Sequence, residues 1–152
     1  METFFNRTNI YDDLQSVFSI SDWITACTGD VVVDSTVTDL GWQEFFCMLE
    51  EFELSRAGKR ASTFNIQAKS LEILLPTGIT DVKHCVHVIM HELFGHEKHL
   101  PYAAWLETRG KGKYIKILIS ERYYSKEELI YEDRWKSDRF QNKLTGKLCK
   151  AD

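Results

Sequence analysis

The chain has 152 residues, 43% hydrophobic content, only two prolines and a formal net charge of −4. This length and composition fit one folded domain and exclude a disordered chain. The charge is divided by position: residues 1–55 hold eleven acidic side chains and one basic one, a net charge of −10, whereas residues 56–152 carry +6. Such asymmetry points to polyelectrolyte partners, although ordinary solvated faces show it too.

The cysteines and the first residues indicate the compartment. The four cysteines are widely spaced with no Cys-x-x-Cys motif, which indicates neither a zinc ribbon nor a disulfide framework and favours reduced thiols. The chain does not start with a basic segment followed by an apolar one, and no apolar run approaches the roughly 20 residues of a membrane span. We therefore expect a cytoplasmic protein without a membrane segment.

The first third of the chain predicts mainly helices. Apolar residues at helical spacing predict the first one: Ile10, Leu14, Val17 and Phe18. Ser21 and Asp22 are expected to cap a second short helix that ends at Gly29, and residues 31–33 predict a short strand.

A third, acidic helix is expected from Thr38 to about Gly58. One side carries the apolar residues Leu40, Phe45, Leu49 and Phe52. The other carries four carboxylates that we expect to bind a partner, as DNA phosphates would: Glu44, Glu50, Glu51 and Glu53.

Residues 64–75 alternate between apolar and polar side chains, which predicts one bent strand or two short ones before a turn at residues 76–78. Residues 79–95 then form the clearest amphipathic helix, with apolar residues on one side and three histidines, His84, His87 and His91, on the other. His91 and His96 are five apart, which excludes a zincin motif. The three helical histidines are still compatible with binding one ion together, or with a charge interaction at the negative end of the helix dipole. No metal or cofactor is predicted.

Two apolar runs, residues 102–106 and 114–119, flank a glycine-rich connection and predict a β-hairpin. Cations at its tip and nearby aromatic rings are typical of nucleic-acid surfaces, since phosphates pair with Lys or Arg and bases stack on rings. The candidate nucleic-acid-binding residues are Arg109, Lys111, Lys113, Tyr102, Trp105 and Tyr114. The alternative is a solvated hairpin tip with core aromatics.

A catalytic set is the weaker alternative. Arg122 is able to hold a phosphodiester while Glu121 or His91 exchanges protons, which is the minimum for a metal-independent ribonuclease. Alternation along a strand separates Glu121 from Arg122 unless a bulge intervenes, so an internal ion pair is the competing interpretation.

Beyond this set, Ser125 and Glu128 match a capping box and predict a helix through Tyr131, and the basic tail beyond Trp135 is expected to be irregular. The overall prediction is an α+β fold in a single domain, 1–152. An acidic helical part, 1–58, precedes an α+β body, 59–152, that holds a small antiparallel sheet, a packed amphipathic helix and a β-hairpin.

Residues 96–124, with segments 134–140 and 145–149, resemble proteins of plasmids and conjugative elements of Gram-positive bacteria that accompany mobilisation and replication genes. Relaxase chemistry is not implied, because His84 and His87 do not form the His-hydrophobic-His metal motif. Among acidic proteins of such elements, the chain is similar in size and charge to anti-CRISPR inhibitors of type II effector nucleases.

This resemblance implies an inhibitor that binds an RNA-guided CRISPR effector nuclease or its guide RNA. The alternatives are a small nuclease or relaxase-like enzyme that cleaves RNA or DNA, and a structural module that self-associates. The sequence leaves the oligomeric state and the presence of enzymatic activity open.

Overall fold

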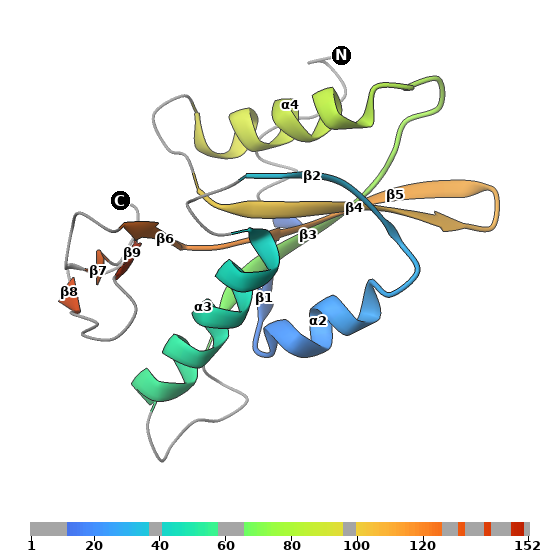
Figure 1. The fold of residues 1–152 in the computed structure, drawn as a ribbon. Coiled ribbons are helices and arrows are strands. Elements are labelled where there is room, and N and C mark those ends of the chain that lie inside the picture. Colours follow the sequence, from blue (N-terminus) through green and yellow to red (C-terminus); the bar gives the residue numbers. More distant parts are fainter. Residues whose placement is uncertain are drawn as a thin grey trace.

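The computed structural model describes residues 12–36, 41–57, 66–95, 100–125, 131–132, 139–140 and 147–150, and its centre is a five-stranded antiparallel sheet (Figure 1). The strand order is β1-β3-β5-β4-β2. The strands are β1 (Gln15–Val17), β2 (Val31–Ser35), β3 (Ala68–Leu74), β4 (Tyr102–Arg109) and β5 (Gly112–Ile119). Both edge strands therefore come from the acidic first third of the chain.

Helix α4 (Val82–Phe94) covers one face of the sheet, and its apolar stripe explains why. Cys85, Val86, Ile89 and Leu93 are buried against alternate residues of the central strands, such as Leu71 and Ile117. The Asp81 side chain accepts a hydrogen bond from the backbone N–H of His84 and starts the helix, and Gly95, with a φ of 72°, ends it.

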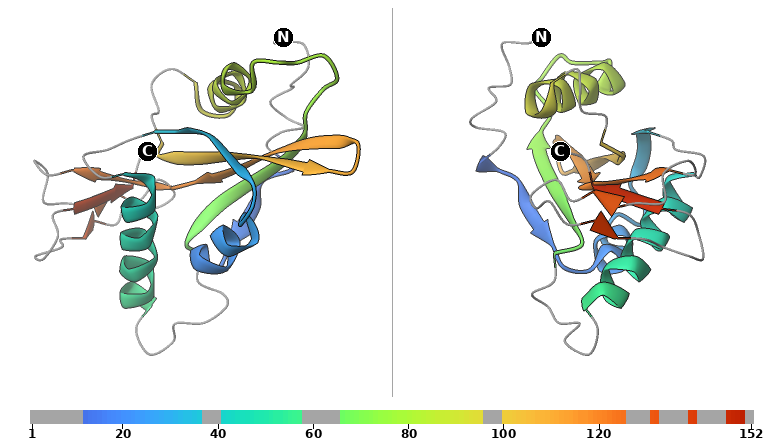
Figure 2. Two further views of the ribbon diagram at one scale, coloured as in Figure 1. Left: turned by 45° about the vertical axis from the view of Figure 1, so that its right-hand side comes forward. Right: turned by 90° about the vertical axis from the view of Figure 1, so that its left-hand side faces the viewer.

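Helices α2 (Ile20–Ala26) and α3 (Trp42–Ala57) cover the opposite face (Figure 2). Their core consists of Val17, Ile20, Phe45, Phe46 and Leu49 packed on Ala68, Ala103, Trp105 and Leu118. The Trp105 ring lies edge-on to two helix residues, with centroids 5.3 Å from Trp23 and 5.1 Å from Trp42. One sheet is thus packed between helices on both faces.

A bulge in β2 reorients the chain at Val33. Val32 is opposite Trp105 and Asp34 is opposite Ala104, so Val33 is an extra residue between them. Val33 packs against the core under α4, and the bulge also turns Asp34 toward α4. The acidic first third is in this way connected to both faces of the sheet.

The remaining described strands are β6 (Arg122–Ser125), β7 (Tyr131–Glu132), β8 (Arg139–Phe140) and β9 (Lys147–Lys150). They form two small sheets, in which β6 pairs with β9 and β7 pairs with β8. No helix in the described ranges has the length and apolarity of a membrane span.

The predicted α+β class is confirmed, and so are the amphipathic helix and the hairpin, whose turn is Gly110-Lys111. Three expectations are wrong. Residues 15–17 of the first predicted helix form a strand, Tyr131 lies in β7 rather than in a helix, and β9 gives the basic tail a paired strand. Thr38 and residues 126–130 lie outside the described residues.

The division into an acidic helical part, 1–58, and a body, 59–152, does not separate two packed units. β1 pairs with β3 and β2 pairs with β4, so the sheet joins both parts. Local periodicity does not report such pairings, because the partners are far apart in sequence.

Candidate functional site

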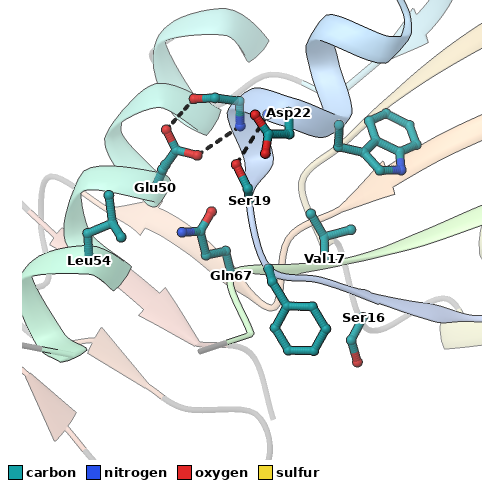
Figure 3. Close-up of a pocket in the computed structure, with 10 residues that line it drawn as sticks. Ser16, Val17, Ser19, Asp22, Glu50, Leu54 and Gln67 are labelled. Carbon is teal, nitrogen blue, oxygen red and sulfur yellow. Dashed lines mark hydrogen bonds between the residues drawn. The ribbon is translucent and has the colours of Figure 1, made fainter. Parts of the chain in front are cut away.

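An open groove of about 1030 Å³ lies between β1, α2 and α3 (Figure 3). Its lining residues are Ser16, Val17 and Phe18 from β1 and the residue after it, Ser19, Ser21, Asp22 and Trp23 at the start of α2, Glu50 and Leu54 from α3, and Gln67 just before β3. Two large apolar side chains in this lining are unusually exposed, Phe18 at 42% and Leu54 at 44%. The groove therefore combines apolar walls with carboxylates.

Gln67 is the buried polar residue of the groove, with 5% of its surface exposed. Its side-chain Oε1 accepts a hydrogen bond of 2.8 Å from the backbone N–H of Ile20, at the start of α2. A backbone N–H requires an oxygen acceptor, so this bond fixes which end of the amide is the nitrogen. The Nε2 group then lies on the side of the groove that faces Leu54 (Figure 3).

The two carboxylates of the groove differ in their partners. Glu50 accepts hydrogen bonds from the backbone N–H of Ser21, at 2.8 Å, and from the Ser21 hydroxyl, so it joins α3 to the first turn of α2. Asp22 lies in that first turn and its side chain is exposed. A carboxylate is favoured there by the helix dipole.

The four predicted partner-binding residues of α3 do not form one surface. Glu44 and Glu51 are exposed, and Glu50 bonds to α2. Glu53 is buried, at 5% exposed, and forms an ion pair with Arg122. Glu53 is therefore not available to a partner, and this part of the expectation is corrected: a residue near the C-terminal end of the helix meets β6, which sequence spacing does not reveal.

The predicted catalytic residues are distributed over both faces of the sheet. Arg122 is 1% exposed, pairs with Glu53 and lies 4.9 Å from the centre of the Phe52 ring, on the α3 side. Glu121 is buried, and His91 is exposed on α4, which covers the other face. The structure supports the ion-pair interpretation of Arg122 and does not bring it together with His91.

The histidine side of α4 is exposed, as the spacing predicts, and His87 on this side contacts a largely buried carboxylate, Asp34. His87 Nε2 is 2.9 Å from Asp34 Oδ2, and the same oxygen accepts a 2.5 Å hydrogen bond from the Tyr102 hydroxyl. Lys83 Nζ is 3.9 Å from the other Asp34 oxygen. Burial, followed by the bond to Asp34, raises the pKa of Tyr102.

This cluster joins β2, α4 and β4. In the described part of the chain, no three His, Cys, Asp or Glu side chains are arranged to hold a metal ion. The contacts of Asp34 with His87 and Tyr102 connect the three elements. Sequence reasoning missed the cluster because Asp34 turns toward α4 only through the bulge at Val33.

The hairpin residues divide into paired and exposed cations. Arg109 forms ion pairs with Glu72 and Glu107, which raise its pKa, and its guanidinium lies 4.1 Å from the centre of the Tyr114 ring. Lys111 and Lys113 are exposed at the tip. Lys111 and Lys113 are thus the cations of this hairpin that are available to contact phosphates, whereas Arg109 already pairs with carboxylates.

Two predicted stacking residues are covered. Tyr102 is 6% exposed and Trp105 is 3% exposed, under α4 and under α2 with α3 respectively. A ring must expose a face to stack on a base, so these two rings belong to the core and the expectation is corrected. Their position in the middle strands of the sheet, opposite Ile119 and Lys116, explains the burial.

Sequence reasoning also missed the groove between β1, α2 and α3. Gln67 and its partner Ile20 are 47 residues apart, and no local pattern marks a pair at that separation. Comparisons with protein families, with curated proteins and with solved structures give no match to this chain.

Proposed function

We propose that this protein acts by binding a protein that has a basic surface, and that this partner is an RNA-guided CRISPR effector nuclease whose activity it inhibits. The observation that carries the proposal is the set of exposed carboxylates on the two helices of one face: Asp22 on α2 with Glu44 and Glu51 on α3. Acidic surfaces of this kind bind grooves that otherwise hold nucleic acid.

The composition of the two helices supports this surface. They contain five acidic residues and a single basic residue, Arg56. The apolar sides of the helices are already buried in the core with Trp105, so the carboxylates are presented on a rigid support. Rigid presentation reduces the entropy lost on binding.

The burial of Arg122 favours a binding function over a catalytic one. An arginine that holds a phosphodiester must reach solvent, and Arg122 is buried against Glu53 and Phe52. The exposed lysines of the hairpin tip, Lys111 and Lys113, are the proposed contacts to guide RNA. The proposed action takes place in the cytoplasm, where such effectors meet nucleic acid.

The test combines the purified protein with a type II effector nuclease, its guide RNA and target DNA, followed by native gels and by RNA gels. We expect a stable complex, lost DNA binding and an intact guide. A shortened guide would support the enzyme alternative instead, and self-association without any complex would support a structural module.

The charge requirement is tested by the triple variant Asp22→Asn, Glu44→Gln, Glu51→Gln. We expect its affinity for the effector to fall about tenfold or more at low salt and by less at high salt, because exposed charges act mainly on association and are screened. Glu92→Gln on α4, on the other face of the sheet, is the control and leaves the affinity unchanged. Equal affinity of the triple variant and the wild type would refute the proposal.

A further inference from the structure

We infer that the groove between β1, α2 and α3 binds an extended peptide segment of a partner protein, in which an apolar side chain is next to Lys or Arg. The inference rests on the proposed function, because it places the anchoring contact of the partner beside the acidic surface of α2 and α3. Three features of the groove carry it: a hydrogen-bond donor, apolar walls and negative charge.

The donor is the Nε2 group of Gln67. Gln67 is 5% exposed, and its Oε1 accepts the hydrogen bond from the backbone N–H of Ile20. Nε2 reaches the groove on the side that faces Leu54 (Figure 3). Because the bond to Ile20 fixes the orientation of the amide, Nε2 is a donor held in place at the groove surface, where an acceptor of a ligand can replace water.

The charge of the groove selects the kind of acceptor. Asp22 and Glu50 line the same groove, and both disfavour a phosphate or carboxylate oxygen near Nε2. A neutral carbonyl is the acceptor that remains, and an extended polypeptide presents one at every residue. The same carboxylates attract a basic side chain that follows or precedes this carbonyl.

The walls supply the apolar contact. Phe18 and Leu54 are exposed by 42% and 44%, and both line the groove. Single exposed apolar residues are ordinary on protein surfaces, but two that share one concave site beside an oriented polar group are typical of recognition. A Leu- or Phe-sized side chain of the partner would remove both from water.

The test is selection of random dodecapeptides displayed on phage against the immobilised full-length protein. We expect enriched sequences with Leu, Ile or Phe adjacent to Lys or Arg. Leu54→Asn should lower the affinity of a selected peptide about tenfold or more, since it removes an apolar wall from an already exposed position. The matched control is Leu74→Asn, which alters a 56% exposed leucine of β3 that does not line the groove.

The donor is tested by Gln67→Glu. The variant keeps an oxygen for the Ile20 N–H and replaces the donating group with a second acceptor, so we expect peptide affinity to fall about tenfold or more. In NMR spectra of the wild-type protein, the Gln67 side-chain amide signal should shift when a selected peptide is added. A melting temperature of Leu54→Asn close to that of the wild type ensures that the loss of binding is not a loss of folding.

Several outcomes overturn the inference: no enrichment, enrichment of acidic peptides, peptide binding that Leu54→Asn and Gln67→Glu leave unchanged, or occupation of the groove by a second copy of the chain in concentrated solution. These outcomes are independent of the effector-binding test. Effector binding that needs Asp22, Glu44 and Glu51 but not Leu54 would leave the proposed function standing and remove the groove from it.

Discussion

Individual residues show how a local pattern is changed by the fold. The four glutamates of α3 are expected on one side, yet at about 100° per residue Glu53 lies near the buried Leu49 and roughly opposite Glu44. Glu44 and Glu51 face solvent, Glu50 supports the start of α2 and Glu53 meets Arg122. Spacing therefore already separates Glu53 from Glu44, and the neighbours of α3 decide what each glutamate contacts. Spacing along a helix predicts a direction, whereas burial is decided by contacts that come from elsewhere in the chain.

At the residue scale, Tyr102 predicts a dependence of stability on alkaline pH. Burial and the Asp34 bond favour its neutral phenol, so its pKa is raised in the folded state above the usual value of about 10. The unfolded chain releases this proton first. The stabilisation is therefore fully present below pH 10 and is lost as pH rises from there through the folded pKa.

The measurement compares wild type with Tyr102→Phe by urea unfolding between pH 7 and pH 11. Near neutral pH, the variant should have a lower free energy of unfolding by about 1–3 kcal/mol, because Asp34 loses a buried donor. The difference should stay constant to about pH 9 and shrink above pH 10. A difference that stays constant to pH 11 in samples with native circular dichroism would contradict the assignment.

Elements differ in how far the sequence predicts them. Helix α4 and the β4–β5 hairpin are confirmed because each carries its own signal, an apolar stripe with a glycine end in one case and a two-residue turn in the other. Strand β1 has three residues and its partner, β3, lies about fifty residues later, so the apolar spacing at Val17 and Phe18 favoured a helix instead. The groove depends on this short strand, which is why it was not predicted.

The contact between α3 and β6 gives a prediction at the element scale. The side chains of Glu53 and Arg122 are 6% and 2% exposed, so removal of either charge leaves the other buried. We expect Glu53→Met and Arg122→Met each to lower the free energy of unfolding by about 3–5 kcal/mol, and the double variant to lose clearly less than the sum. Chemical denaturation of the four proteins gives the coupling energy.

Glu51→Gln is the matched control, since Glu51 belongs to the same helix and is exposed. Its free energy of unfolding should stay within about 0.5 kcal/mol of wild type. If the Glu53 variant were as mild as this control, or if the two single effects were additive, Arg122 would not be held by Glu53 in the way described.

At the scale of the whole molecule, the opposite charges of the two sequence parts meet in one sheet. Lys116, in the central strand β5, is 2.9 Å from Asp30 and 3.8 Å from Glu107. Burial lowers the pKa of Lys116, but the bond to Asp30 and neighbouring negative charge outweigh this and raise it. Part of the acidic excess of the first third therefore neutralises the body internally, and the exposed carboxylates of α2 and α3 remain available to a partner.

The last prediction follows from this arrangement. A fragment of residues 59–152 lacks both edge strands and both helices of one face, so Ala103, Trp105 and Leu118 would be exposed to water. Burial of such side chains is worth roughly 1.5–3 kcal/mol each for the larger ones, which is a large share of the stability of a small domain. We expect the fragment to show no cooperative unfolding transition, whereas the full chain unfolds in one transition that coincides by tryptophan fluorescence and circular dichroism. A fragment that unfolds sharply, with Trp105 fluorescence like that of the full chain, would mean that residues 59–152 are a domain by themselves and that the acidic part is an addition to it.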